Sequence, residues 1–180
     1  MKSLNKFKPI LGMCSQGQQK SGVDEGALYL YNNVFKEVCE EKPYVIRKKQ
    51  FDTQDGYQKL FGVCRKSQLP LVIGGDRSIS SSAVLASIQR FRDLQVIYID
   101  AHPDINTYES TATGNTHGTV MAVCTGLEKK HWASRISLKL LLPKNLIYVG
   151  VRDIDSFERE QIDRLGIKNY TYWQAVDFIN

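Results

Sequence analysis

Short apolar runs alternate along the chain with longer segments in which apolar residues recur at helical spacing. A short apolar run between turn residues is typical of a buried strand, whereas recurrence every three or four residues indicates an amphipathic helix. The apolar runs predict strands over residues 9–14, 44–46, 69–73, 94–100, 146–150 and 167–170. The helical spacing predicts helices over residues 25–41, 54–66, 79–91, 117–127, 157–165 and 172–178.

Three of these elements carry more specific expectations. The run 94–100 is apolar almost throughout, which indicates a strand buried on both faces of a sheet. The helix over 79–91 has Ser78 or Ser80 in position to cap its first turn. The helix over 25–41 is expected to bury one face, made of Leu28, Tyr31, Val34, Phe35 and Val38.

The regular alternation of strands and helices predicts an α/β fold, in which helices cover a parallel β-sheet. In such folds, functional side chains lie in loops at the carboxyl ends of the strands. Three polar clusters follow predicted strands in this way, at residues 74–78, 100–106 and 152–158, and a fourth, at 111–118, lies in the loop before a helix.

The composition is typical of a globular protein and argues against several classes of partner. The 180 residues are 42% hydrophobic, which is enough for one domain with a sizeable core. The net charge of +5 is scattered, unlike the cationic stripe of a protein that binds nucleic acid. No apolar run approaches the ~20 residues of a membrane span, and no secretory leader is visible. We therefore expect a cytoplasmic protein with neither nucleic acid nor membrane as a partner. Its four cysteines are widely spaced, which indicates buried thiols rather than a zinc site or disulfides.

The cluster at 100–106 has the spacing of a metal site. Asp100, His102 and Asp104 alternate along an extended segment, so their side chains point to the same side. Two carboxylates and an imidazole suit a divalent ion such as Mn²⁺, and paired ions can activate water for hydrolysis. The alternative is a capping carboxylate beside a buried, hydrogen-bonded histidine.

Five segments together resemble motifs of the arginase (ureohydrolase) family, in the same order and over nearly the whole chain. The segments are Ser-Gly-Val-Asp-Glu-Gly at 21–26, Gly-Gly-Asp-Arg-Ser at 74–78, Asp-Ala-His-Pro-Asp-Ile-Asn at 100–106, Thr-Gly-Asn-Thr-His-Gly at 113–118, and Gly-Val-Arg-Asp-Ile-Asp at 150–155. The Asn-x-His-Gly loop makes the resemblance closer to arginase than to agmatinase. His131 belongs to no matching motif and is expected at the surface.

The resemblance implies a fold, a reaction and a metal centre. The fold would be the three-layer, arginase-deacetylase-like parallel β-sheet flanked by helices. The reaction would be the Mn²⁺-dependent hydrolysis of L-arginine, or a related guanidino compound, with L-arginine giving L-ornithine and urea. Two Mn²⁺ ions per subunit are implied, with Asp100 bridging both, His102 on one and Asp104 on the other. A homo-oligomer, a trimer in the family, is also implied.

The resemblance also assigns the residues around the reacting groups. His117 would shuttle a proton to the leaving amine, and it is expected with Asp104 to be catalytic. The ordinary pKa of histidine, near 6.5, suits that task, although His117 could instead only start a helix. The implied substrate-binding residues are Asn106, Thr111, Thr113, Asn115, Asp155 and Glu158.

One motif departs from the family at a metal-binding position. Arg77 stands where the family has a histidine, and a guanidinium has no lone pair for a metal ion. Arg77 could pair with Asp100 and Asp104 and replace the charge of an ion. It could instead point to solvent and leave a weakened metal site. In either case we expect at most partial occupancy by Mn²⁺.

The length is the second departure, because family members are longer. Residues 1–180 are expected to form a single, incomplete arginase-like domain, truncated before the last two central strands. Those strands lie between the third and fourth strands of the family's sheet. Without them, the third and fourth strands either keep open edges or pair directly.

Three functional hypotheses follow. The first is an arginase-type enzyme, weak or inactive in this chain alone. The second is a catalytically dead fragment, or a binding or interaction protein with a degenerate metal site. The third, a Rossmann-type nucleotide-binding domain, is disfavoured because neither Gly-x-Gly-x-x-Gly nor a P-loop is present.

Overall fold

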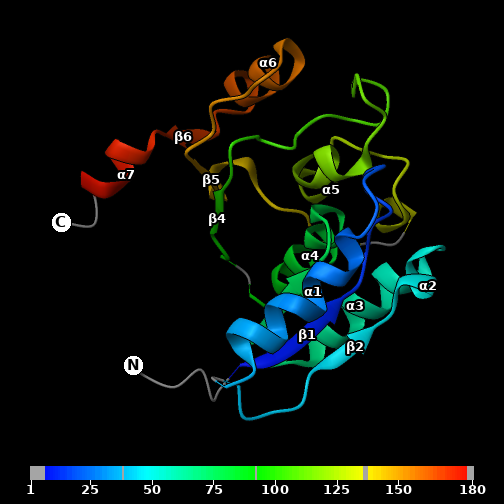
Figure 1. Ribbon diagram of the computed structural model, residues 1–180. Coiled ribbons are helices and arrows are strands. Elements are labelled where there is room, and N and C mark those ends of the chain that lie inside the picture. Colours follow the sequence, from blue (N-terminus) through cyan, green and yellow to red (C-terminus); the bar gives the residue numbers. More distant parts are fainter. Residues whose placement is uncertain (1–6, 38, 92, 136–137, 178–180) are drawn as a thin grey trace.

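The computed structural model describes residues 7–37, 39–91, 93–135 and 138–177. Its strands form two separate three-stranded sheets, ordered β2-β1-β3 and β4-β5-β6, and every pairing is parallel (Figure 1). The strands are β1 (Lys8–Gly12), β2 (Tyr44–Ile46), β3 (Pro70–Gly74), β4 (Val96–Ile99), β5 (Leu146–Val149) and β6 (Lys168–Tyr170). The strand–helix alternation predicted from the sequence is confirmed.

Helices follow or precede each strand. The α-helices are α1 (Val23–Leu30), α2 (Lys48–Phe51), α3 (Asp55–Lys66), α4 (Ser80–Arg90), α5 (Val120–Thr125), α6 (Ser156–Leu165) and α7 (Tyr172–Asp177). A π-helical segment, Tyr31–Phe35, continues α1, and short 3-10 helices occur at Arg77–Ile79, Thr116–Thr119, Trp132–Arg135 and Pro143–Asn145. None of the helices in the described part of the chain is both long and apolar enough to cross a membrane.

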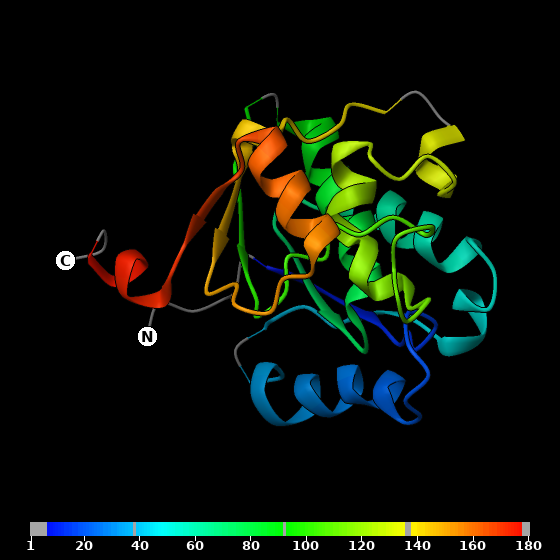
Figure 2. The same cartoon turned by 90° about the horizontal axis from the view of Figure 1, so that it is seen from above.

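The first sheet separates two apolar clusters. Leu11 and Ile73 pack with Ala27 and Tyr31 on one side of the sheet. Ile10 faces the main core, which includes residues of α3, α4 and α5. Because successive side chains of a strand point to opposite faces, the neighbours Ile10 and Leu11 serve different clusters. Figure 2 shows α1 on one side of this sheet and α3, α4 and α5 on the other, which gives three layers.

The expected apolar face of the first helix is partly wrong. Leu28 is 42% exposed and Val34 is 55% exposed, whereas Ala27 and Tyr31 are buried. The buried stripe is set by the contact of α1 with the first sheet, and Ala27 and Tyr31 lie four residues apart on that stripe. Val38 lies outside the described residues.

The expected burial of the strand over 94–100 is also wrong. Val96 and Tyr98 pack against the main core, but Ile97 is 63% exposed and Ile99 is 77% exposed. The core contacts only one face of β4, so alternate residues remain open to solvent.

The cap before α4 differs from the expectation of a serine. The Asp76 carboxylate accepts a hydrogen bond from the Ser78 amide at 2.8 Å. This bond starts the 3-10 turn Arg77–Ile79, which runs directly into α4. An aspartate is a strong helix-capping residue, and here it acts one turn earlier than predicted.

The two sheets do not join. β3 ends one sheet and β4 ends the other, and no pairing between them occurs among the described residues. The alternative in which these strands pair directly is therefore wrong, and both keep an open edge. All four cysteines are buried and unpaired.

Candidate functional site

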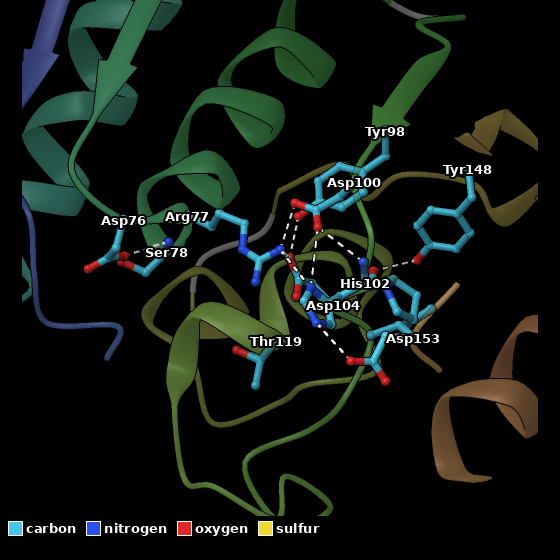
Figure 3. A network of polar contacts seen from close by, with 12 residues as sticks. Asp76, Arg77, Ser78, Tyr98, Asp100, His102, Asp104, Thr119, Tyr148 and Asp153 are labelled. Atoms are coloured by element: carbon cyan, nitrogen blue, oxygen red, sulfur yellow. Dashed lines mark hydrogen bonds and ion pairs between the residues drawn. The ribbon is translucent and has the colours of Figure 1, made fainter. Parts of the chain in front are cut away.

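The site lies where the chain leaves β3 and β4. Arg77 is on the 3-10 turn after β3, and Asp100, His102 and Asp104 follow β4. Figure 3 shows the Arg77 guanidinium reaching across to the two aspartates. Its Nη1 atom lies 2.6 Å from Asp100 Oδ2 and 3.3 Å from Asp104 Oδ2. Of the two alternatives for Arg77, the structure shows the one in which it pairs with these carboxylates.

This pairing changes the electrostatics of each partner. Burial disfavours the charge on Arg77, but its contacts with Asp100 and Asp104 outweigh burial and raise its pKa. Burial works against the charge on Asp100 as well, yet the Arg77 contact and the His102 amide lower the pKa of Asp100. Burial dominates at Asp104 and raises its pKa to about 6. The guanidinium thus supplies the positive charge that keeps Asp100 ionised.

The arrangement does not fit a two-metal centre. Both carboxylates expected to bind metal already face a permanent cation, which would repel a divalent ion. The ring nitrogens of His102 lie 3.4 Å from Asp100 Oδ1 and 3.2 Å from Asp153 Oδ2. Within residues 7–37, 39–91, 93–135 and 138–177, no group of three or more His, Cys, Asp or Glu side chains is placed to hold a metal ion. Metal binding by Asp100, His102 and Asp104 stays a prediction.

Asp104 is the most constrained residue of the site. It is 2% exposed and has a φ angle of 49°, in the left-handed region. Aspartate tolerates this region better than most residues, and such strain gathers at functional sites. The Tyr98 hydroxyl donates a hydrogen bond to Asp104 Oδ2. The Tyr148 hydroxyl holds the same loop by donating to the Pro103 carbonyl at 2.9 Å.

Neither tyrosine was expected in the site. A signal for Tyr98 exists in the sequence, because it precedes Asp100 by two residues and therefore points to the same side of the strand. Tyr148 has no such signal. It comes from β5, and its ring meets that of Tyr98 edge-on at a centroid distance of 5.9 Å.

A pocket of about 250 Å³ gathers the predicted site residues, with the exception of Asp100. Its lining combines residues that follow β4, the loop before α5 and the start of α6. The lining residues are Arg77, His102, Asp104, Asn106, Thr111, Ala112, Thr113, Asn115, His117, Gly118, Asp153, Asp155 and Glu158. Segments far apart in the sequence therefore meet here, as the position of their loops predicted.

Asp155 and Glu158 stabilise the first turn of α6, whether or not they also contact a ligand. Asp155 Oδ1 accepts from the Glu158 amide at 2.9 Å, and Glu158 Oε2 accepts from the Asp155 amide at 3.4 Å. This capping box starts α6. The Asp-x-x-Glu spacing is the signal in the sequence that indicates this cap. Glu158 also accepts from the Ile105 amide at 3.2 Å, and burial raises its pKa to about 7.

Asn106 joins this cap to the loop that follows it, at residues 107–115. Its Nδ2 donates to Asp155 Oδ2 at 2.6 Å, and its Oδ1 accepts from the Ser110 hydroxyl at 2.7 Å. Thr111 and Thr113 place their hydroxyls 3.4 Å apart, and the Asn115 amide donates to Thr113 at 3.3 Å. These predicted residues therefore form hydrogen-bonded groups, one of Asn106, Asp155 and Glu158 and one of Thr111, Thr113 and Asn115.

His117 lies on the 3-10 turn Thr116–Thr119 at the edge of the pocket. Its amide donates to the Gly17 carbonyl at 3.1 Å, and its buried Nδ1 has no partner among the described residues. Burial and the charge of Arg77 lower its pKa. The expectation of an ordinary pKa for His117 is thus wrong, and its neutral form is favoured.

His131 does not lie free at the surface, contrary to expectation. It packs beside Trp132 at a ring-centroid distance of 5.3 Å, and its Nδ1 accepts from the Ala133 amide at 3.3 Å. Burial lowers the pKa of His131 to about 4. It lines a separate pocket of about 170 Å³ and takes no part in the candidate site.

Comparison with known sequences supports the family resemblance that the motifs indicate. The sequence model of the Arginase family matches residues 13–177. The arginase of Eremothecium gossypii is 29% identical over 200 residues, covering 94% of this chain and 50% of the relative. The arginase of Plasmodium falciparum is 40% identical over 112 residues, covering 59% of this chain and 27% of the relative. This chain thus spans half the length of the first relative and about a quarter of the second.

Comparison with solved structures agrees with the sequence matches. An Entamoeba histolytica arginase in complex with L-ornithine superposes with a TM-score of 0.78 at 25% identity, covering 94% of this chain and 66% of that chain. A Bacillus subtilis arginase has a TM-score of 0.78 at 27% identity, covering 96% of this chain and 65% of that chain. Since the family model matches most of the sequence and these structures share its fold, the chain belongs to the arginase family.

Proposed function

We propose that this arginase-family chain binds L-arginine or a related guanidino compound in the 250 Å³ pocket, and that its hydrolysis of this ligand is impaired. The observation that carries the proposal is the contact of 2.6 Å between Arg77 Nη1 and Asp100 Oδ2. A permanent cation stands where the family's reaction needs a metal ligand with a lone pair.

The charge of the pocket supports a cationic ligand. Four carboxylates line it against one guanidinium: Asp104, Asp153, Asp155 and Glu158 oppose Arg77. Hydroxyl and amide groups on the loop 106–115 supply donors for a ligand carboxylate. The Entamoeba relative is described in complex with L-ornithine, an amino acid of this type.

We propose at most partial occupancy by Mn²⁺. The residues that would hold an ion are Asp100, His102 and Asp104, but in the folded chain the two aspartates pair with Arg77. Binding of the amino acid through the polar loop needs no metal. We further propose a cytoplasmic location, with residues 1–180 forming a single, incomplete arginase-like domain and the trimer of the family as the assembly to test by light scattering.

Two measurements test the proposal. Purified chain is assayed for urea release from L-arginine with and without excess Mn²⁺, with Bacillus subtilis arginase as the positive control. We expect no urea above the metal-free sample. Calorimetric titration of the metal-free chain with L-arginine should still give heat. Urea release at a rate near the control contradicts impairment, and an absence of heat contradicts binding.

The second candidate is a Mn²⁺-dependent hydrolase. It is favoured by the convergence of the predicted substrate residues and His117 on one pocket. It differs from the first candidate in requiring Mn²⁺ to displace Arg77 from its carboxylates. Metal analysis after dialysis discriminates between them, since close to two bound Mn²⁺ per chain supports the hydrolase.

A further inference from the structure

A second pocket, which we call the aromatic pocket, lies beside the candidate site. It has a volume of about 170 Å³ and shares no lining residue with the candidate pocket of about 250 Å³. Two 3-10 turns border both pockets. Arg77 and His117 line the candidate pocket, and on the same turns Ser78 and Thr119 line the aromatic pocket. Figure 3 shows the Arg77 side chain extending toward Asp100 and away from Ser78.

The walls of the aromatic pocket suit a flat ring. Four of its lining side chains carry rings: Tyr57, Tyr108, His131 and Trp132. Two buried valines of α5 add an aliphatic surface. Rings stack favourably on one another, edge-on or offset. Since an apolar cavity of about 150 Å³ accepts a molecule of benzene, a pocket of this size has room for one substituted ring.

The aromatic pocket carries no formal charge near neutral pH. Within the described part of the chain, none of its lining residues is Asp, Glu, Lys or Arg. His131 lines it, but burial lowers the pKa of His131 to about 4, so the ring is neutral. Burying an ion without an opposite charge is costly, which means that this pocket favours a neutral ligand. The candidate pocket differs, because four carboxylates and a guanidinium line it.

The walls also hold hydrogen-bond donors without acceptors. Nδ1 of His131 accepts from the Ala133 amide at 3.3 Å, so the neutral ring carries its proton on Nε2. Nε1 of Trp132 is buried and has no partner among the described residues. The hydroxyl of Tyr108 likewise has no hydrogen-bond partner in the described ranges. A donor left without an acceptor in a protein interior is costly, and a bound molecule with an acceptor would relieve that cost.

We infer that the aromatic pocket is a binding site for a neutral, single-ring aromatic carboxamide. The rings of the pocket would pack against the ring of the ligand, and its carbonyl would accept from the unpaired donors. This inference does not depend on the ligand or reaction proposed for the candidate pocket. His131 and Trp132 belong to none of the five segments that resemble family motifs.

Three probes of nearly the same shape test the inference. Benzamide, benzoate and benzamidinium each join one benzene ring to a small planar group, and they are neutral, anionic and cationic. We expect benzamide to bind saturably with a Kd of about 1 mM or tighter, as suits so small a ligand. Benzoate and benzamidinium should bind in this pocket at least about tenfold more weakly, because each would bury an unpaired charge. No saturable binding of benzamide, or equal binding of either ion in this pocket, would overturn the inference.

The two tryptophans of the chain provide a specific readout. Trp132 is 4% exposed and lines the aromatic pocket, whereas Trp173 of α7 is 73% exposed and lines neither pocket. Each gives one indole N–H signal in a nitrogen-15 NMR spectrum, and Trp173→Phe assigns the two signals. Benzamide should shift the signal of Trp132 and leave that of Trp173 in place. Equal shifts of both signals, or a shift of Trp173 alone, contradict binding in this pocket. Occupation of the candidate pocket by benzamidinium is distinguished in the same way.

A matched pair of variants tests the donors. Tyr108→Phe removes one hydroxyl from the aromatic pocket and keeps the ring, so benzamide binding should weaken by about threefold to tenfold. Tyr29→Phe makes the same change on α1, at a position that is 68% exposed and outside the pocket, and should leave the Kd unchanged. An unchanged Kd in Tyr108→Phe would overturn the assignment of benzamide to this pocket. Circular dichroism of both variants confirms that weaker binding is not a lost fold.

Discussion

The guanidinium of Arg77 lies 2.6 Å from a carboxylate oxygen of Asp100, and the same Nη1 atom lies 3.3 Å from Asp104. The two aspartates follow β4, whereas Arg77 follows β3, so this contact ties together two sheets that share no hydrogen-bonded strands within the described part of the chain. The contact therefore has consequences both for the stability of the fold and for the chemistry of the site.

Replacing Arg77 with methionine should destabilise the fold. The change leaves Asp100 and the nearly buried Asp104 without their cation, and an uncompensated buried charge is costly. Since Arg77 itself is 31% exposed, we expect a loss of about 1–3 kcal/mol in the free energy of unfolding. Urea denaturation measures it. Arg159→Met, at an exposed position of α6, is the matched control and should stay within about 0.5 kcal/mol of the unchanged chain. An equal loss in both variants would show that the ion pair is not responsible.

Replacing Arg77 with histidine should create Mn²⁺ binding that the unchanged chain lacks or has only weakly. The substitution removes a cation and adds an imidazole beside Asp100, His102 and Asp104, so nitrogen and oxygen ligands converge without a competing charge. Calorimetric titration with MnCl₂ checks this. The double variant Arg77→His, Asp104→Asn should lose the gain. Identical titration curves for Arg77→His and the unchanged chain would contradict the role we give to Arg77.

The two tyrosines of the site should differ in their contribution to stability. Tyr98→Phe removes a hydrogen bond to the carboxylate of Asp104, and bonds to charged groups are worth about 1.5–3 kcal/mol. Tyr148→Phe removes a bond to the neutral carbonyl of Pro103, worth about 0.5–1.5 kcal/mol. Both variants keep the edge-on contact of the rings. Thermal or urea unfolding should therefore rank Tyr98→Phe as the more destabilising change, and the reverse order would contradict this account of Asp104.

Glu158 should make stability fall as the pH rises. Its pKa is raised from the ordinary 4.5 to about 7, chiefly by burial, so the folded state favours the protonated form. The stabilisation is complete below pH 4.5 and is lost as the pH passes through about 7. The difference in unfolding free energy between the unchanged chain and Glu158→Gln, measured from pH 4 to pH 8, isolates this group. Glu160→Gln, at an exposed position of the same helix, should show no such slope.

Much of the candidate site could be predicted from the sequence, because it depends on spacing and on strand ends. Residues 100, 102 and 104 alternate on one side of an extended segment, and parallel strands bring their following loops to one edge. The pocket confirms that the loops meet. The Asp-x-x-Glu spacing of Asp155 and Glu158 also indicates the cap of α6, whereas their likeness to the family's motif indicates a substrate segment.

Other features required the tertiary structure. Whether Arg77 turned to solvent or toward Asp100 depended on the distance across the gap between β3 and β4, which no local pattern encodes. The exposure of Ile97 and Ile99 arose because the core packs on a single face of β4, whereas an apolar run looks the same whether one face or both are covered. The shifted pKa of His117 likewise came from its burial and from Arg77, a residue forty positions away.

The sequence by itself determined the order of strands and helices, the loops that carry the polar residues, and membership of the arginase family, since these follow from periodicity and from short motifs. Only the tertiary structure decided that the sheet stays divided, that Arg77 pairs with Asp100 and Asp104, and that β3 and β4 share an open groove. The physical reason is that the second group of features depends on contacts between segments distant in the chain, where packing and charge decide among conformations that the local sequence permits equally.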